Sequence, residues 1–207
     1  MKLPLRPTKG PIITIGGLHG VGKSTYGRRL AEAFGLDYVS TGTLFRELAQ
    51  ERGLSIVELS DLSATDPSID HMIDESSKRL MAEGDVLFDS LLAGYFAKEY
   101  ESFRIYLWAP PEVRMARIAS REGKGLKAAE DETLLRERRE LERFKRYYGI
   151  DVVDTSVYHL VLDTSLLSLE TNLKILSEAI ACYLEEKWSD YVRYGYWKDL
   201  RQDARQG

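Results

Sequence analysis

The run from Gly17 to Ser24, GLHGVGKS, is the part of the chain whose residue types and spacing most clearly predict chemistry. It fits the pattern G-x-x-x-x-G-K-[ST] and lies between a β-branched segment, residues 12–15, and a helical pattern that begins near Gly22. Glycines let backbone N–H groups turn inward around phosphate oxygens, and a helix N-terminus adds partial positive charge. In such a loop Lys23 reaches the β- and γ-phosphates of a nucleoside triphosphate, and the Ser24 hydroxyl faces Mg²⁺.

This phosphate loop, residues 17–24, predicts a donor nucleotide site but does not name the acceptor of the phosphoryl group. We expect ATP to contact Gly17, Leu18, His19, Gly20, Val21, Gly22, Lys23, Ser24 and Thr25. We assign the side chain of His19 no role beyond its backbone. GTPases, ATPases, motors and small-molecule kinases share such loops. The sequence lacks the run N-K-x-D that reads guanine, which argues against a GTPase.

Asp89 ends a predicted buried strand, VLFD. Ligands of parallel sheets bind at the carboxyl ends of the strands. We therefore expect Asp89 to orient the Mg²⁺ shell or the acceptor. The alternative is an acid that caps a turn at the end of the strand.

Arg114, Arg117 and Arg121 are spaced i, i+3 and i+7, which places them on one face of a predicted helix. None of the three has an acid three or four residues away, so pairing along the helix surface does not explain them. A triphosphate and the phosphoryl group in transfer would be suitable anions opposite these arginines, because one guanidinium group can bind two phosphate oxygens at once. The alternative is a solvated basic face.

A second set, Arg136, Glu140 and Arg143, is spaced i, i+4 and i+7 on the next predicted helix. Many acids and arginines alternate around them, so exposed ion pairs explain this set equally well on spacing alone. Between the two helices, the run REGKGLKAAED is suited to a mobile cover over phosphates, here called the lid, residues 122–133. Such a cover would exclude water as a competing acceptor.

The candidate site residues must be held by strands and helices. Strand-like and helix-like segments alternate along the chain. Short β-branched or apolar runs fall at residues 12–15, 37–40, 85–90, 103–109 and 158–164. Helical patterns lie between them, including one at 67–83 with Asp66 as N-cap and Pro67 as first residue. This alternation predicts a three-layer α/β/α fold with a parallel sheet of about five strands.

Composition sets further bounds on the class of protein. The chain has 207 residues, 43% of them hydrophobic, which is enough for one hydrophobic core. Its net charge is −4, so it has no overall positive charge that would attract nucleic acid. The single cysteine, Cys182, excludes an internal disulfide and is expected to be an ordinary buried residue. No apolar run is long enough to cross a membrane. We expect a cytoplasmic protein with small-molecule partners and neither nucleic acid nor membrane.

Several runs together resemble the archaeal-type cytidylate kinases, a branch of the P-loop nucleoside monophosphate kinases. The resemblance covers about residues 12–183 and rests on GGLHGVGKST, YVSTGTLFRELAQERG, DPSIDHMIDE, IYLWAPPEVRMARIASREGK and YYGIDVVDTSVYHLVLDTS. It implies ATP-dependent phosphorylation of CMP, and commonly dCMP, to the diphosphate, with ADP as the second product and Mg²⁺ as cofactor. It also implies a single kinase domain, about residues 1–187, with a helical segment at about 41–83 that binds the monophosphate.

Carried over position by position, the resemblance implies two groups of residues. The catalytic group is Lys23, Arg117, Arg121 and Arg136, with Ser24 toward the metal. The acceptor-binding group is Thr41, Arg46, Asp89, Glu140 and Arg143. It thereby favours function over exposed pairing for the second set of arginines.

Two departures from the family pattern leave the acceptor open. Leu91 stands where many members have an arginine, and Thr43 stands where an acid is common. The alternatives are a kinase for AMP, UMP or a small metabolite, and a nucleotide-binding regulator with weak catalysis. The last residues, 188–207, carry several aromatics and are expected to pack on the domain or to form a weak homo-oligomer contact.

Overall fold

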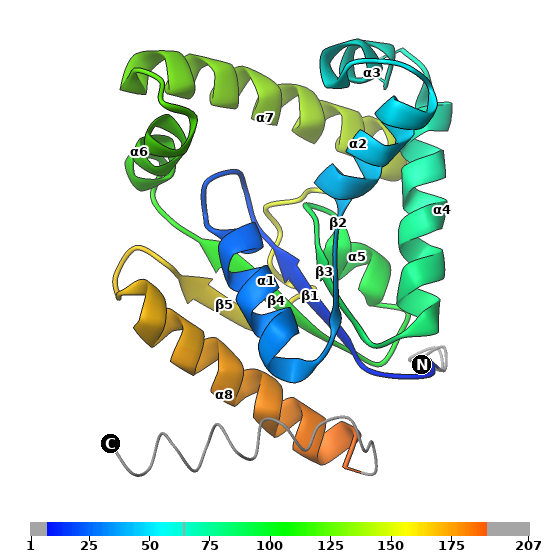
Figure 1. Cartoon of the computed structure of the whole chain (residues 1–207), viewed down its shortest axis with the longest axis vertical. Coiled ribbons are helices and arrows are strands. Elements are labelled where there is room, and N and C mark those ends of the chain that lie inside the picture. The colour runs from blue at the N-terminus through cyan, green and yellow to red at the C-terminus, as the bar shows by residue number, and fades with distance from the viewer. Residues whose placement is uncertain (1–7, 64, 190–207) are drawn as a thin grey trace.

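The computed structural model describes residues 8–63 and 65–189. Five strands alternate with eight helices in this part of the chain (Figure 1). The elements are β1 (Ile12–Gly16), α1 (Lys23–Phe34), β2 (Asp37–Ser40), α2 (Thr41–Glu51), α3 (Ile56–Ser63), α4 (Pro67–Glu83), β3 (Val86–Asp89), α5 (Ala93–Ala97), β4 (Ser102–Trp108), α6 (Pro111–Glu122), α7 (Leu126–Tyr148), β5 (Leu160–Asp163) and α8 (Leu169–Lys187).

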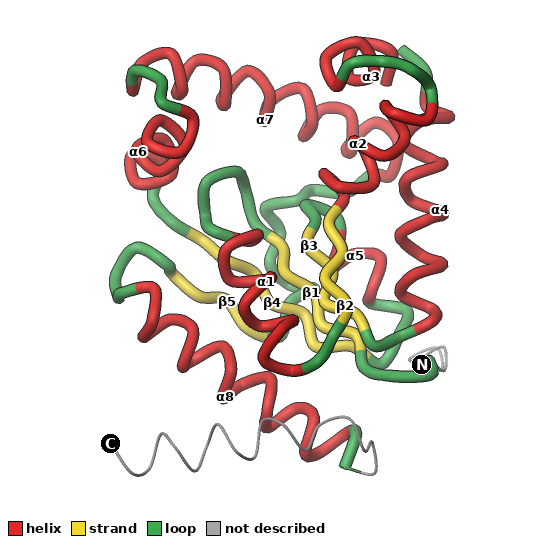
Figure 2. The backbone as a smooth tube through the Cα atoms, viewed as in Figure 1, coloured by secondary structure: helices red, strands yellow, loops and turns green. Residues whose placement is uncertain are grey.

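The strands form one parallel sheet in the order β2-β3-β1-β4-β5. The central strand β1 places Ile12 opposite Val86 of β3 and opposite Ser102 of β4. Helices cover both faces of the sheet (Figure 2), so its strands are largely buried, as parallel strands usually are. The predicted fold class is confirmed.

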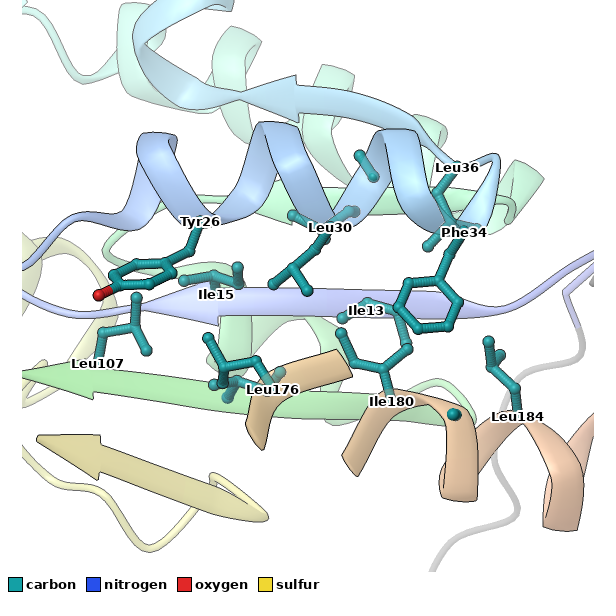
Figure 3. Close-up of a cluster of buried hydrophobic side chains, with 14 of the residues drawn as sticks. Ile13, Ile15, Tyr26, Leu30, Phe34, Leu36, Leu107, Leu176, Ile180 and Leu184 are labelled. Atoms are coloured by element: carbon teal, nitrogen blue, oxygen red, sulfur yellow. The ribbon is translucent and has the colours of Figure 1, made fainter. Parts of the chain in front are cut away.

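Helices α1 and α8 pack on one face of the sheet. Ile13 and Ile15 point to this face, because alternate side chains of a strand share a side, and they meet Leu30 of α1 and Leu176 of α8 (Figure 3). On the other face Ile12 and Phe88 pack with residues of α4 and α5. The two clusters fix the carboxyl ends of β1 and β3, which carry the predicted site.

The remaining helices stand beyond the carboxyl ends of the strands (Figure 1). Helices α2 and α3, with the first half of α4, lie to one side, α6 lies to the other, and α7 extends from α6 across to α4. Only residues 123–125 separate α6 from α7, so most of the expected lid is helical rather than a long loop. Met115, Ile118 and Ala119 of α6 bury their side chains against Ala129 of α7.

Local signals explain the helix ends that the sequence predicted. Asp66 is the N-cap of α4, and its side chain accepts a hydrogen bond from the Ser68 N–H. Gly84 is the C-cap of the same helix. Gly35 ends α1 in the left-handed conformation, with φ of 64°. Helices α3 and α5 were not predicted, and the expectation for Cys182 was wrong, since its side chain is exposed on α8.

The aromatic-rich C-terminal run, residues 188–207, was predicted to pack on the domain or to form an oligomer contact. Most of it, residues 190–207, lies outside the described residues. Within them, Trp188 packs against the α1–α8 core and donates a hydrogen bond from Nε1 to the Tyr183 hydroxyl, at 3.3 Å. Among the described helices none is both long and apolar enough to cross a bilayer.

A buried acid joins α4 to the end of α7. Asp74 is 6% exposed and accepts a hydrogen bond from the Tyr148 hydroxyl. Burial raises the pKa of Asp74 to about 6, although the Tyr148 hydrogen bond acts in the opposite direction. Burial and the same carboxylate also raise the pKa of Tyr148.

We predict that Gly16→Ala destabilises the fold by about 2–3 kcal/mol. A Cβ at Gly16 would lie 2.3 Å from the hydroxyl oxygen of Tyr158, and the same ring is also packed closely on Gly94, where a Cβ would lie 2.3 Å from its Cε1. Thermal unfolding would measure the loss. Gly42→Ala is the control, since its nearest neighbour lies 3.6 Å away and alanine favours the helix.

We predict that Asp74→Asn changes how stability depends on pH. Between about pH 4 and about pH 6 folded wild-type protein keeps a proton on Asp74 that the unfolded chain has released, so its stability falls as pH rises through this window. The fall should be roughly 2 kcal/mol larger than in Asp74→Asn. Urea unfolding at a series of pH values tests this, with exposed Glu75→Gln on the same helix as control. Parallel profiles for wild type and Asp74→Asn would contradict it.

Candidate active site

The phosphate loop connects β1 to α1 through a backbone that glycine alone adopts readily. Gly17, Gly20 and Gly22 have φ values of 133°, 81° and 98°. A Cβ on Gly17 would lie 2.3 Å from the carbonyl oxygen of Leu107 in β4. Gly22 is the N-cap of α1, so the positive end of that helix faces the loop.

Lys23 folds back along the loop that precedes it. Its Nζ donates to the carbonyl oxygens of Gly17 at 2.8 Å and Leu18 at 3.1 Å. Burial lowers the pKa of Lys23, while the negative charges of Asp89 and Glu140 act to raise it. The ammonium group is thus held at the loop and lies within the field of acids from β3 and α7.

Asp89 and Ser24 form an oxygen-rich pair beside Lys23. The Ser24 hydroxyl donates to Asp89 Oδ2 at 2.8 Å, and the Tyr38 hydroxyl donates to the same oxygen at 2.7 Å. Asp89 is 4% exposed. A buried carboxylate next to a serine hydroxyl, facing a phosphate loop, is the donor chemistry that Mg²⁺ prefers, so these residues fit the ion.

A buried ion pair holds the outer side of the loop. Arg114 of α6 and Glu137 of α7 join at 2.5 Å, and both also bond to the backbone of His19. The sequence interpretation placed an external anion opposite Arg114. The structure corrects it, because the acid of the next helix occupies that place.

The two arginines expected at the transferred phosphoryl have different surroundings. Arg117 is held by the segment after β5, donating to the carbonyl oxygen of Thr164 at 2.8 Å and to its hydroxyl at 2.9 Å. The Thr164 hydroxyl in turn donates to the carbonyl oxygen of Val21, at 3.0 Å. Arg121 is exposed and pairs with Glu122 at 2.7 Å. Arg117 therefore lies against the loop, and Arg121 faces solvent.

Glu140 joins α7 to the loop through the side chain of His19. Its Oε2 accepts from His19 Nε2 at 2.7 Å, and its Oε1 accepts from Arg136 Nε at 3.0 Å. Burial favours the neutral acid, but the bonds and charges of His19 and Arg136 prevail and lower the pKa of Glu140 to about 2. His19, given no side-chain role from the sequence, is thus a contact between the loop and α7.

The residues expected at the acceptor lie on α2 and the second half of α7. Arg143 Nη1 donates to the Ser63 hydroxyl at 3.1 Å, and its Nε lies 2.9 Å from Asp70 Oδ2 as an ion pair not aligned for a hydrogen bond. Arg46 is exposed and donates to the Thr43 hydroxyl at 3.1 Å.

Thr41 begins α2 and its hydroxyl lies 3.5 Å from the carbonyl oxygen of Asp89. The acceptor segment thereby starts at the same strand end as the Ser24–Asp89 pair. The donor and acceptor residues predicted from the sequence are on neighbouring elements around the carboxyl ends of β1 and β3 (Figure 1).

Sequence reasoning missed Tyr38, Asp70 and Glu137. Asp70 follows Ile69, a buried apolar residue of α4, and that neighbourhood was a signal for a partly buried acid. Tyr38 and Glu137 gave no such signal, because their partners are distant in sequence.

Comparison with known proteins gives the family. The model of the cytidylate kinase-like family matches residues 12–166. The chain is 47% identical to the cytidylate kinase of Aeropyrum pernix, over 79% of this chain and 95% of that protein. It is 42% identical to the cytidylate kinase of Staphylothermus marinus, over 84% and 99%.

Solved structures show the same fold at low sequence identity. Shikimate kinase from Bacteroides thetaiotaomicron superposes with a TM-score of 0.57 and 14% identity, over 83% of this chain and 98% of that one. Protein TT1252 from Thermus thermophilus gives 0.56 and 21%, over 85% and 99%. With a phosphate loop of this geometry and relatives of this similarity, the chain belongs to the cytidylate kinase-like family.

Proposed function

We propose that the protein transfers the γ-phosphoryl group of ATP to CMP, giving ADP and CDP, and that dCMP is a second acceptor. The observation that carries the proposal is the placement of Lys23. It lies in a complete phosphate loop and within the field of Arg136, expected to be catalytic, and of Asp89 and Glu140, expected at the acceptor. Relatives named cytidylate kinase, 42–47% identical, support CMP as the acceptor.

The donor side of the proposal uses the loop and the Ser24–Asp89 pair. The loop N–H groups and Lys23 would bind the β- and γ-phosphates, with Gly17, Gly20 and Gly22 allowing the close approach. Ser24 would hold Mg²⁺ directly, and Asp89 would hold it through water. The ion, when bound, neutralises charge that builds up between the β- and γ-phosphates.

Transfer itself needs positive charge more than it needs a base. The transition state is loose and the acceptor phosphate is already anionic, so positioning and electrostatic stabilisation suffice. Lys23, Arg117 and Arg136 would supply that charge, and exposed Arg121 would join them from α6. Asp89 is not needed as a general base.

The acceptor side uses Arg46 and Arg143 for the phosphate, with Thr41 and Glu140 beside them. Arg143 is already oriented by Ser63 and Asp70, and Arg46 by Thr43. Planar guanidinium groups bind two phosphate oxygens at once, which suits a monophosphate dianion. These substrates are small molecules of the cytoplasm, where we propose the protein acts.

An acceptor panel is the direct test. Purified protein with Mg-ATP would be given CMP, dCMP, UMP, AMP and GMP in turn, and ADP formation would be followed. We expect CMP to be the best acceptor and dCMP the second. Turnover with AMP alone would replace the proposal by an adenylate acceptor. ATP binding without turnover of any acceptor would favour a regulator, the alternative that Leu91 raises.

We predict that Lys23→Ala lowers kcat by a factor of about 10³ or more while the fold is kept, because a loop cation at the transferred group is lost. Circular dichroism would check the fold and ADP formation the rate. Lys127→Ala is the matched control, since Lys127 is an exposed lysine paired on the surface of α7. Equal activity of the two variants would refute the role of the loop.

We predict that Arg143→Ala raises KM for CMP about tenfold to a hundredfold with a small effect on KM for ATP, because a charged hydrogen-bond donor to the acceptor is removed. The exposed Arg139 of the same helix gives the control variant Arg139→Ala. A change confined to ATP would assign Arg143 to the donor side instead.

A further inference from the structure

The buried ion pair of Arg114 and Glu137 lies on the phosphate loop but contains none of the residues assigned to catalysis. Arg114 is 4% exposed and Glu137 6% exposed. Arg114 Nη1 lies 2.5 Å from Glu137 Oε1, and Nη2 lies 3.2 Å from Oε2, so the guanidinium binds the carboxylate with both arms. Removing two charged groups from water costs free energy, so a buried ion pair is weak evidence for a role in stability alone.

They hold one residue of the loop by both of its backbone groups. Arg114 Nη1 donates to the carbonyl oxygen of His19 at 2.8 Å, and Glu137 Oε1 accepts from the His19 N–H at 3.0 Å. The His19 N–H is therefore already bound to an acceptor from α7. Its orientation restricts the peptide units on either side.

The next residue shows the same close packing independently. Gly20 has φ of 81°, and a Cβ there would lie 2.7 Å from the carbonyl oxygen of Arg114 and 3.0 Å from its Cα. The loop thus lies directly on the backbone of α6. Side-chain bonds and van der Waals contact fix the same two residues, His19 and Gly20.

The charges of the pair also matter to an anionic ligand. The negative charge of Glu137 is among those that act on Lys23, so it is felt at the loop. Alone, a carboxylate in this place would repel the polyphosphate of a nucleotide. Arg114 cancels that charge and leaves Glu137 as a neutralised hydrogen-bond acceptor for the loop.

We propose that Arg114 and Glu137 are positioning residues for the donor nucleotide. They fix the two peptide units that flank His19, so that the loop is shaped before ATP binds, and Arg114 removes the repulsion that Glu137 would otherwise exert on the phosphates. This inference rests on the proposed function in one respect, that the loop binds ATP.

The test compares ATP affinity in Arg114→Met and in the double variant Arg114→Met, Glu137→Gln. Arg114→Met leaves a carboxylate unneutralised beside the loop. The double variant restores neutrality and keeps an amide oxygen that accepts from the His19 N–H. Calorimetry with Mg-ATP gives Kd, steady-state kinetics give KM for ATP and for CMP, and thermal unfolding gives stability. Arg29→Met, which breaks an exposed pair between α1 and α8, is the control.

We expect Arg114→Met to weaken ATP binding about tenfold or more and the double variant to recover at least a third of that loss on the logarithmic scale. KM for CMP should change less than threefold in both variants, and Arg29→Met should match wild type. Wild-type Kd for ATP in folded Arg114→Met would overturn the inference. So would equal losses for ATP and CMP that follow thermal stability alone.

A second variant keeps the test decisive if Arg114→Met does not fold. Arg114→Lys retains the charge but has one ammonium group in place of the two-armed fork, so it cannot bind Glu137 and His19 in the same way. We expect it to fold and to bind ATP about threefold more weakly. Unchanged affinity would count against the fork geometry. If wild-type protein does not bind ATP, the proposed function itself fails, which these variants would not cause.

Discussion

One residue of the phosphate loop, His19, is bound through both its N–H and its carbonyl oxygen by an ion pair that is itself buried. The loop would otherwise depend on its own backbone, which is rich in glycine and therefore costly to order. The Arg114–Glu137 pair supplies order from outside, at the tip, while β1 and α1 supply it at the two ends. Three parts of the fold therefore form the donor site: the sheet, the helix α1 after the loop, and the pair of helices α6 and α7.

The second constraint is the balance of charge around Lys23. Burial disfavours its ammonium form, and acids from β3 and α7 favour it. Those acids have cationic or hydroxyl partners of their own, Arg136 for Glu140 and Ser24 for Asp89. Around Lys23, Glu140 is thus paired with a cation, and Asp89 is bound by hydroxyl groups.

The sequence was sufficient to predict the elements whose residues interact locally. The five strands, the start of α4 at Asp66 and the end of α1 at Gly35 follow from β-branched runs, a cap and a left-handed glycine. Helix α5 was missed because it has five residues, and its burial against the sheet outweighs its glycine and aromatic content. Cys182 was misplaced because its neighbours on α8 are apolar while its own side faces solvent.

The site was predicted where a motif carried it and missed where a tertiary contact carried it. The loop, Ser24 and Asp89 come from spacing and from a strand end. The pairing of Arg114 with Glu137 joins two helices whose residues are 23 positions apart, which no helical spacing rule covers. The bond from His19 to Glu140 spans 121 positions and depends on the crossing of α7 over the loop.

The short connection between α6 and α7 decides what kind of motion is available around the nucleotide. Residues 123–125 cannot fold into a separate flap, and the two helices are joined by an apolar contact as well as by their buried charges. A movement of one of the two helices would therefore carry the other with it. At the far ends, Pro110 and Pro111 limit the backbone before α6, and the end of α7 is joined to α4 through Tyr148 and Asp74. A movement of the α6–α7 hairpin would therefore act on α4 as well as on the loop.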